Sequence, residues 1–296
     1  MKIVIGIDSS PASQYVVQEA VTRPWPKETQ FSVITIIDPF YFARFPALVE
    51  DAKHEGAAMV KAAAGKLAYV GHAANNETIL GNPRTAISEY AKQCAADFIM
   101  VGSHGQGALA RFLLGSVAQG TLRTAPCSIE IVRHSASGSP SSAVAMKILL
   151  ATDGSEFSTA AARSLAHRPW PARSQFRILS AEELPTLVYP GDGSSLSPVY
   201  PPSLLQELLD SARSHAKKAA ESAREILLAA GLKSVESNQA TVGNPRGLIL
   251  DLAKEWGANL IVLGSHGRRG LDRLIMGSVS ESVALYAHCS VEVIRP

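Results

Sequence analysis

Short apolar runs alternate with longer segments rich in Ala, Leu and Lys along the chain. Runs with the length and β-branched content of strands occur at Ile3–Ile7, Phe31–Ile37, Glu77–Leu80, Phe98–Val101 and Ser128–Val132. Segments of helical length, such as Leu48–Val70 and Arg84–Cys94, lie between them. Fully apolar runs such as FIMV are typical of central parallel strands that helices cover on both faces. The first part of the chain is therefore predicted to be an α/β domain.

The same pattern occurs twice, so the chain is a tandem duplication. Residues 2–10 (KIVIGIDSS) recur as 147–155 (KILLATDGS), and residues 102–105 (GSHG) recur as 264–267. The segments 23–26 (RPWP) and 81–84 (GNPR) are also repeated, at 168–171 and 243–246. We assign residues 1–134 to a first domain, 135–145 to a linker and 146–296 to a second domain, with an insertion at Leu187–Pro202.

Each copy is predicted to be a doubly wound domain, a five-stranded parallel sheet with helices on both faces. The right-handed crossover rule favours the strand order 3-2-1-4-5. Ligands of such sheets bind beyond the carboxyl ends of the strands, where the chain reverses direction, here between strands 1 and 4. Asp8 and Gly102 lie there in the first copy, and Asp153 and Gly264 in the second.

A glycine pattern follows strand 4 in both copies, Gly-2x-Gly-9x-Gly-Ser. Its residues are Gly102, Gly105, Gly115 and Ser116, and then Gly264, Gly267, Gly277 and Ser278. Glycine allows backbone N–H groups to approach an anion closely, and each serine is predicted to cap the helix that follows. The helix N-terminus adds donors and a positive dipole end. The pattern indicates a phosphate site, and turn formation alone is the alternative.

This spacing, with an aspartate after strand 1, resembles the nucleotide-binding branch of the universal stress protein family over nearly the whole chain. The resemblance implies ATP at the switch point of each domain, with phosphates against the glycines, the serines and the valines that follow them, Val117 and Val279. Any Mg²⁺ would arrive with the phosphates. The implied function is that of an ATP-binding stress-response regulator; a slow ATPase or phosphotransferase, and a nucleotide-free scaffold, are the alternatives.

The same resemblance assigns the other end of the nucleotide. Asp8 and Asp153 would face the ribose and adenine region, and Ile36 would pack on the adenine. The residue equivalent to Ile36 is Ala181, whose methyl covers less of a purine. The second site is therefore expected to be the weaker one.

Charge and composition narrow the function further. The chain has 28 Lys and Arg residues against 26 Asp and Glu, a net charge of +2, which argues against general nucleic-acid binding. No apolar stretch is long enough to span a membrane, and the start of the chain has no signal-peptide pattern. Three cysteines fit a reducing cytoplasm, the expected location. No P-loop, HExxH or CxxC pattern is present.

Two further expectations concern helices and assembly. Asn82 and Asn244 are predicted to cap helices, whereas Arg111 and Arg273, within the glycine pattern, either reach phosphate or are solvated. In the order 3-2-1-4-5 the fifth strand is an uncovered edge, a template for pairing. We therefore predict that Ser128–Val132 pairs with Ser290–Ile294 within the chain. A homodimer of whole chains is implied by the family resemblance alone.

Overall fold

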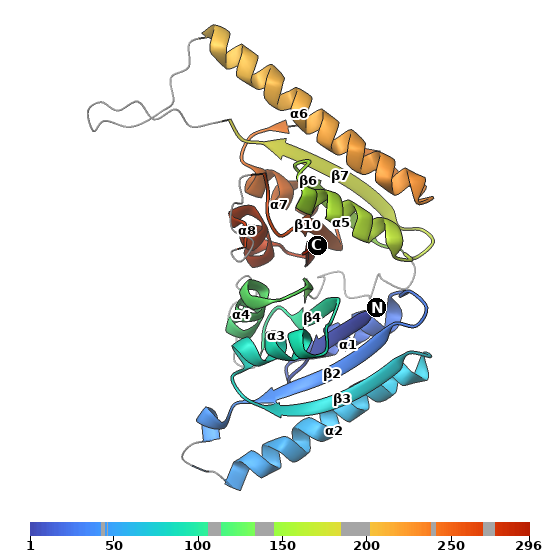
Figure 1. Cartoon of the computed structure of the whole chain (residues 1–296), viewed down its shortest axis with the longest axis vertical. Helices are drawn as coiled ribbons and strands as arrows, with labels where there is room; N and C mark the ends of the chain where they lie inside the picture. The colour runs from blue at the N-terminus through green and yellow to red at the C-terminus, as the bar shows by residue number, and fades with distance from the viewer. Residues whose placement is uncertain are drawn as a thin grey trace, which may run out of the picture.

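The computed structural model of the chain consists of two α/β halves that meet edge to edge (Figure 1). It describes residues 1–42, 45, 47–105, 114–133, 145–184, 202–237, 241–268 and 276–296. Three predicted features lie outside the described residues: the arginines at 111 and 273, residues 135–144 of the linker, and residues 187–201 of the insertion. The last residue of the insertion, Pro202, begins a helix. Among the described residues, no helix is long and apolar enough to cross a membrane.

The elements follow the predicted alternation closely. The first half contains β1 (Lys2–Gly6), α1 (Pro11–Thr22), β2 (Gln30–Ile37), η1 (Pro39–Phe42), α2 (Ala47–Tyr69), β3 (Ala73–Leu80), α3 (Pro83–Gln93), β4 (Phe98–Gly102), α4 (Ser116–Thr124) and β5 (Ser128–Val132). The second half contains β6 (Lys147–Thr152), α5 (Glu156–His167), β7 (Gln175–Glu182), α6 (Pro202–Ala229), β8 (Val235–Ser237), β9 (Thr241–Val242), α7 (Pro245–Trp256), β10 (Leu260–Gly264), α8 (Ser278–Tyr286) and β11 (Ser290–Ile294).

The predicted fold class and strand order are confirmed in both halves. The strands form one sheet in the order β3-β2-β1-β4-β5-β11-β10-β6-β7-β8, so each half has the order 3-2-1-4-5. All pairs within a half are parallel. In the second half two short strands, β8 and β9, both pair with β7, where the first half has the single strand β3.

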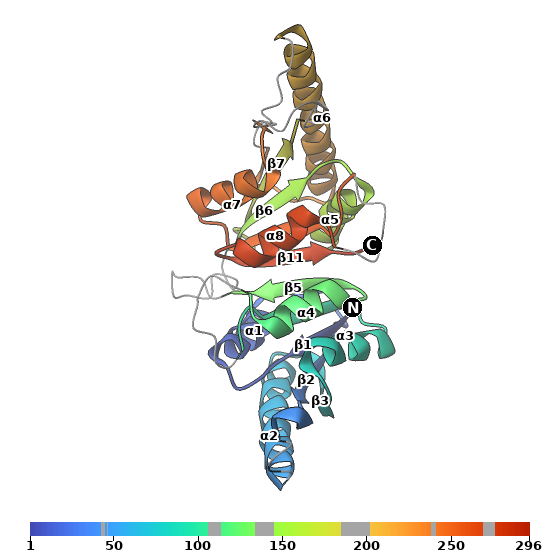
Figure 2. The same ribbon diagram turned by 90° about the vertical axis from the view of Figure 1, so that its left-hand side faces the viewer.

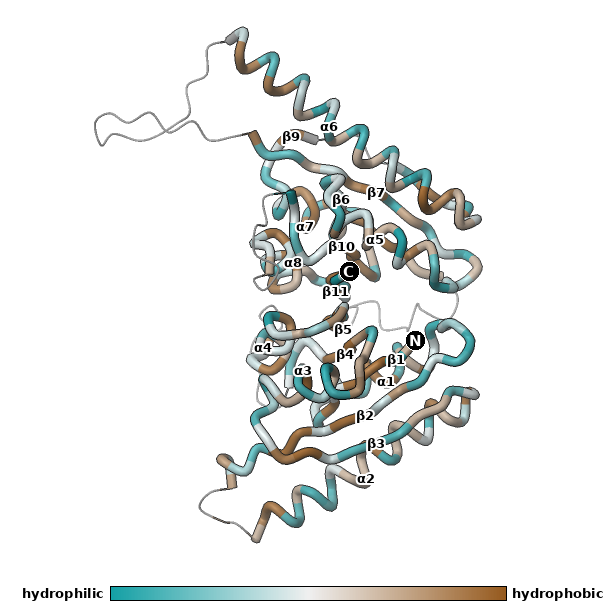
Figure 3. The backbone as a smooth tube through the Cα atoms, viewed as in Figure 1, coloured by the Kyte–Doolittle hydropathy of each residue, from teal (hydrophilic) through white to brown (hydrophobic). Residues whose placement is uncertain are grey.

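Helices cover both faces of the sheet, and the central strands carry much of the hydrophobic sequence (Figure 3). One face has two separate cores, beneath α1 and α2 in the first half and beneath α5 and α6 in the second. On the other face, α3, α4, α7 and α8 share one continuous core that runs through both halves. The two halves are therefore joined by buried apolar surface as well as by strand pairing.

The predicted pairing of the two fifth strands is confirmed. β5 and β11 lie antiparallel at the centre of the molecule (Figure 2), with Glu130 directly opposite Glu292. Both glutamate side chains are fully buried. Two carboxylates placed opposite each other in a sheet repel, so this pairing requires nearby cations.

The repeated RPWP segments provide those cations. Arg23 donates to both carboxylate oxygens of Glu130, at 2.7 Å each, and Arg168 donates to Glu292 at 2.5 Å. The guanidinium of Arg168 also lies 4.9 Å from the ring centroid of Trp170. A buried charge is tolerated when it is paired, so the duplicated segment is explained by the junction rather than by a ligand.

The last helix of each half is also tied to the opposite half. Arg133, after β5, donates to the backbone oxygens of Ala284 and Leu285 near the end of α8, at 2.6 and 3.2 Å. Arg295, after β11, donates to the backbone oxygen of Leu122 in α4 at 3.2 Å. Cations at helix C-termini satisfy free carbonyls and complement the helix dipole. The helices that lead into the two candidate sites are thus anchored across the junction.

Candidate functional site

The aspartate after the first strand of each half holds the loop that opens the next helix. In the first half, Asp8 Oδ1 accepts from the backbone N–H of Ser10 at 3.0 Å and from Ser13 Oγ at 2.7 Å. Ser10 is the N-cap residue of α1, so Asp8 shapes the approach to the helix without capping it. Part of the role of Asp8 is therefore local structure.

The equivalent Asp153 reaches across the switch point. Its Oδ1 accepts from the N–H of Ser155 at 3.0 Å and its Oδ2 from the N–H of Arg268, which follows β10, at 2.9 Å. Burial raises the pKa of the Asp153 carboxyl, but hydrogen bonds from Ser155 and Arg268 outweigh it and leave the pKa below its ordinary value. Asp153 is consequently a fixed negative charge that joins the loops after β6 and β10.

Each glycine of the repeated pattern has a close neighbour. A Cβ on Gly264 would lie 2.6 Å from the backbone carbon of Phe157, and one on Gly102 would lie 2.9 Å from the Cβ of Ala12. A Cβ on Gly105 would lie 2.8 Å from Asp8 Oδ2, and one on Gly267 the same distance from Asp153 Oδ2. Gly102 and Gly264 are required by packing against α1 and α5, whatever the loop binds, whereas a side chain at Gly105 or Gly267 would displace the aspartate carboxylate.

The last glycine of the pattern closes the loop and starts the helix. The N–H groups of Gly115 and Gly277 donate to the backbone oxygens of Ser103 and Ser265, at 2.8 Å each. The prediction that Ser116 and Ser278 are the capping residues is wrong, because the N-cap positions belong to Gly115 and Gly277 and the serines are the first helical residues. Neither N-cap glycine has a side chain to accept from the first-turn N–H groups, and among the described residues no side-chain cap is present at either helix.

In the second half, every predicted site residue lines one cleft of about 460 Å³. The predicted residues in its lining are Asp153, Ala181, Gly264, Gly267, Gly277, Ser278 and Val279. The volume lies within the range of about 300–1,000 Å³ that is usual for small-molecule sites. The cleft lies at the carboxyl ends of β6 and β10, where the strand order reverses.

Two of these local contacts recur in the first half. Ile36, at the end of β2, and Val117, in the first turn of α4, are both partly buried against the core shared by the two halves. Gly105 approaches Asp8, and Gly115 is bonded to the residue after Gly102. The geometry around β1 and β4 therefore repeats that around β6 and β10.

Sequence reasoning missed three charged residues of the second cleft, Glu182, Glu183 and Arg268. Glu182 Oε2 lies 3.2 Å from a guanidinium nitrogen of Arg268. The sequence did contain a signal for the two glutamates. They directly follow Ala181 at the end of a strand, at positions that correspond to Ile37 and Asp38 in the first copy. The pairing of Glu182 with Arg268 depends on β7 and β10 ending at the same edge of the sheet, which the sequence does not state.

Two other repeated features are resolved by the geometry. The side chain of Asn82 accepts from the N–H of Arg84, and that of Asn244 from the N–H of Arg246, both at 3.0 Å. Both asparagines are N-caps, as predicted. Within the described part of the chain, no group of three or more His, Cys, Asp or Glu side chains is placed to hold a metal ion.

Comparison with known proteins gives a consistent result. The model of the universal stress protein family matches residues 1–133 and 145–295. A universal stress protein of Mycolicibacterium smegmatis is 26% identical over 99% of this chain and 97% of its own length. The universal stress protein YxiE of Bacillus subtilis is 31% identical over 50% of this chain and 98% of its own length. The crystal structure of a universal stress protein from Archaeoglobus fulgidus has the same fold, with a TM-score of 0.63 at 19% identity over 99% of this chain and 98% of that chain.

Proposed function

Because the chain belongs to the universal stress protein family, we propose that it is a stress-response regulatory protein that binds ATP in a cleft of each half. The observation that supports this most is the second cleft, where all the residues assigned from the repeated pattern line one cavity. A nucleotide requires an anion site, a polar contact for the ribose and an apolar surface for the base, and the cleft contains all three.

The residues present fit each part of ATP. The N-terminal turn of α8, with Gly277 and Ser278, provides N–H donors and the positive end of the helix dipole for phosphates. Asp153 would accept from the ribose hydroxyls, and Ala181 would contact the base. Both oxygens of Asp153 already accept from backbone N–H groups. A magnesium ion would therefore be held by the phosphates and by water rather than by this carboxylate.

Binding without designed hydrolysis is the function we favour. Besides Asp153, which the sequence indicated, two further carboxylates line the second cleft, those of Glu182 and Glu183. They end β7 beside Ala181, on the side assigned to the base, and Glu182 is paired with Arg268. Catalysis would require a group beside the terminal phosphate to orient the attacking water. In the pose with the phosphates at the start of α8, both carboxylates lie on the side of the base, and Glu182 is occupied by its ion pair with Arg268, so we assign neither of them this role.

The sharpest test places a charge at the helix N-terminus. The glycines are unsuitable for it, because a Cβ on Gly277 would lie 3.0 Å from the backbone oxygen of Ser265. Ser278 is exposed and begins α8, and an acidic residue at that position stabilises a helix while it repels phosphate. We expect Ser278→Asp to weaken ATP binding at the second site at least about tenfold in isothermal titration, with the fold intact.

The matched control is Ser278→Asn, which has nearly the same shape without the charge. It should bind ATP within about twofold of the unmodified protein. Ser116→Asp makes the corresponding change in the first half and should affect only the first site. If the unmodified chain released no nucleotide in mass spectrometry and bound none in titration, the proposal would be wrong. If Ser278→Asp bound ATP normally, the phosphates would lie elsewhere.

The assembly of whole chains is a separate proposal. The pairing of β5 with β11 already uses the sheet edge that single-domain relatives would have free. A homodimer of the tandem chain would therefore form through another surface. Sedimentation equilibrium of the full chain tests it, because a monomer at all concentrations contradicts a dimer.

A further inference from the structure

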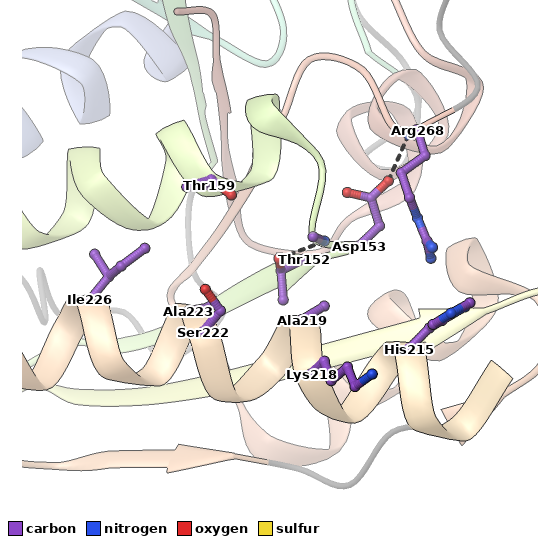
Figure 4. A pocket seen from close by; sticks show the side chains of 11 residues that line it. Thr152, Asp153, Thr159, His215, Lys218, Ala219, Ser222, Ala223, Ile226 and Arg268 are labelled. Carbon is purple, nitrogen blue, oxygen red and sulfur yellow. Dashed lines mark hydrogen bonds between the residues drawn. The ribbon is translucent and has the colours of Figure 1, made fainter. Parts of the chain in front are cut away.

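A second cavity in the second half lies beside the nucleotide cleft, on the other side of Asp153. Its volume is about 260 Å³, and it is a groove between α6 and the loops after β6 and β10 (Figure 4). Its lining residues are Thr152, Asp153, Gly154, Thr159, His215, Lys218, Ala219, Ser222, Ala223, Ile226 and Arg268. Only Thr152, Asp153 and Arg268 are shared with the nucleotide cleft.

Three basic side chains gather at one end of this groove. Arg268 extends from the loop after β10 toward His215 and Lys218 on α6 (Figure 4). Glu182 holds two of them, with Oε2 at 3.2 Å from Arg268 and 3.9 Å from His215 Nδ1. Among the described residues Lys218 has no carboxylate partner, whereas its neighbour Lys217 pairs with Glu221 at 3.9 Å. Within the described part of the chain, Lys218 is thus a cation without a carboxylate partner in the lining of the groove.

The carboxylate of the groove, Asp153, stays ionised and offsets part of this charge, but its position is fixed. Asp153 accepts from the N–H groups of Ser155 and Arg268, so its negative charge is directed at backbone donors. Ser222 and Thr159 add hydroxyl groups to the lining, and Ala219, Ala223 and Ile226 form an apolar floor. Cations next to hydroxyl donors are the usual surroundings of a phosphate group in proteins.

The duplication provides an internal comparison, once α2 and α6 are aligned. Both helices end before a glycine of positive φ, Gly71 at 93° and Gly231 at 83°. The N–H of Gly71 donates to Ala68 and that of Gly231 to Leu228, so the two turns are equivalent. Counting back from them places the fully buried Leu67 opposite the fully buried Leu227, which confirms the alignment.

In this alignment the two halves differ at the groove. His215 corresponds to Glu55, Lys218 to Ala58, and Ala219 to Met59, which packs against the core of the first half. Arg268, directly after the second GSHG, corresponds to Gln106 in the sequence. The second copy therefore has three basic residues where the first has an acid, a methyl and an amide, and a smaller side chain that leaves room beside them. Because three basic residues of the second copy cluster at one groove, the difference points to a function specific to the second half.

We propose that this groove binds the phosphate group of a small ligand, with Lys218 and Arg268 as the charged contacts. The phosphate belongs either to a free phosphorylated molecule or to the terminal end of a nucleotide that occupies the adjoining cleft. Arg268 lines both cavities, so occupation of the groove would draw its guanidinium from Glu182. Binding of a free phosphate does not require that the neighbouring cleft hold a nucleotide, so the two proposals fail separately.

The first experiment titrates the full chain with inorganic phosphate and follows backbone amide signals by NMR. We expect saturable shifts at Gly154 and Ser222, and a loss of affinity of about fivefold or more in Lys218→Ala. Lys217→Ala is the matched control, because it removes the same charge from the adjacent helical position, and its affinity should be unchanged. The same titration with ATP and with adenosine distinguishes the sources.

Each outcome decides the proposal. Saturation by inorganic phosphate that depends on Lys218 supports a free phosphorylated ligand. No binding of inorganic phosphate, together with ATP binding that weakens in Lys218→Ala while adenosine binding does not, supports the terminal phosphate of a nucleotide. Equal effects of Lys217→Ala and Lys218→Ala, or no dependence on Lys218 with either ligand, would overturn the proposal. Loss of ATP binding in Ser278→Asp with unchanged phosphate binding separates the groove from the cleft.

Discussion

Position 181 offers a direct test of the base contact at the scale of one residue. Ala181 lines the second cleft at the end of β7, where the first half has Ile36. Under the proposed pose, Ala181→Ile adds three carbon atoms against the base, and burying apolar surface stabilises the complex by roughly 0.8 kcal/mol per methylene. We expect ATP affinity at the second site to rise about threefold to thirtyfold in titration.

The reverse substitution, Ile36→Ala, should weaken the first site by a similar factor and bring the two affinities together. If Ala181→Ile leaves ATP affinity unchanged while the thermal stability of the fold is preserved, the base does not contact this strand end. An effect on binding of inorganic phosphate would also argue against the assignment, because residue 181 does not line the groove beside α6.

Glu292 provides a pH-dependent prediction. Burial raises the pKa of its carboxyl above the ordinary value of 4.5, and the nearby Glu130 adds to that effect while Arg168 opposes it. A carboxyl with a raised pKa in the folded state takes up a proton more readily when folded, so its contribution to stability grows as pH falls toward 4.5 and is lost as pH rises through the raised pKa. Relative to Glu292→Gln, the unmodified chain should gain stability as the pH falls from the alkaline side toward the ordinary carboxyl pKa of 4.5.

Chemical denaturation at several pH values measures this difference. Glu292→Gln also leaves Arg168 without its partner, a cost of about 3–5 kcal/mol, so the readout is the slope with pH rather than the offset. Glu50→Gln is the control, because Glu50 is exposed on α2 and paired with the nearby Lys53. Its difference from the unmodified chain should be flat. A flat difference for Glu292→Gln as well would mean that the junction carboxyl titrates normally.

At the scale of elements, the apolar runs were sufficient to predict most strands and helices. β5 spans Ser128–Val132 as predicted, and α3 begins and ends within one residue of the prediction. β3 begins at Ala73 rather than Glu77, because the first four residues are two alanines and two asparagines, mostly exposed at the sheet edge, and have no hydrophobic pattern. The burial of Glu130 was equally hard to predict from the sequence. A charged residue on a short strand usually indicates a face exposed to solvent, and only the structure shows its buried partner, Arg23.

The candidate site divides in the same way. Residues that recur in both copies, such as Gly277 and Asp153, were found because repetition made their spacing conspicuous. Arg268 and Lys218 do not recur, and they come together only because α6 and the loop after β10 meet at one end of the sheet. Repetition within the sequence identifies residues that both copies share, whereas residues present in one copy only are brought together by the structure.

Arg133 carries a prediction at the scale of one helix. It ends the first half but donates to backbone oxygens at the end of α8 in the second half. Burial lowers the pKa of its guanidinium to about 10, so it stays charged at neutral pH. Arg133→Met keeps the side-chain volume and removes both bonds, and we expect a loss of about 1–3 kcal/mol in the free energy of unfolding.

Hydrogen exchange locates this loss. Faster exchange should be concentrated in the last turn of α8, because the backbone oxygens there no longer accept hydrogen bonds from Arg133. Arg163→Met on α5 makes the same chemical change at a residue with an exposed side chain and should have little effect on either measurement. Destabilisation spread evenly over both halves would indicate that Arg133 acts through general packing instead.

At the scale of the whole molecule, the question is whether the linker or the interface holds the two halves together. The junction combines an antiparallel pair of strands, a core continuous across both halves, and buried ion pairs on either side of Glu130 and Glu292. Separating the halves would expose that apolar and charged surface to water. We expect this to cost more free energy than the entropy of association that the linker spares. The covalent connection then raises the local concentration of the halves without determining how they pair.

We therefore predict that cutting the chain leaves the halves associated. A protease site inserted within residues 135–144 allows cleavage after folding, and the two fragments should co-elute in size-exclusion chromatography at micromolar concentration. Val293→Asp, which places a charge on the fully buried strand β11 opposite Ile129, is the comparison, and its fragments should separate after cleavage. If the fragments of the unmodified chain separate, the junction is maintained by the linker, and the buried arginine–glutamate pairs contribute little to association. If they stay together and exchange slowly with labelled fragments, the tandem chain behaves as a fixed pair of domains. The switch points of the two halves, on opposite sides of the junction, are then held at a constant distance from each other.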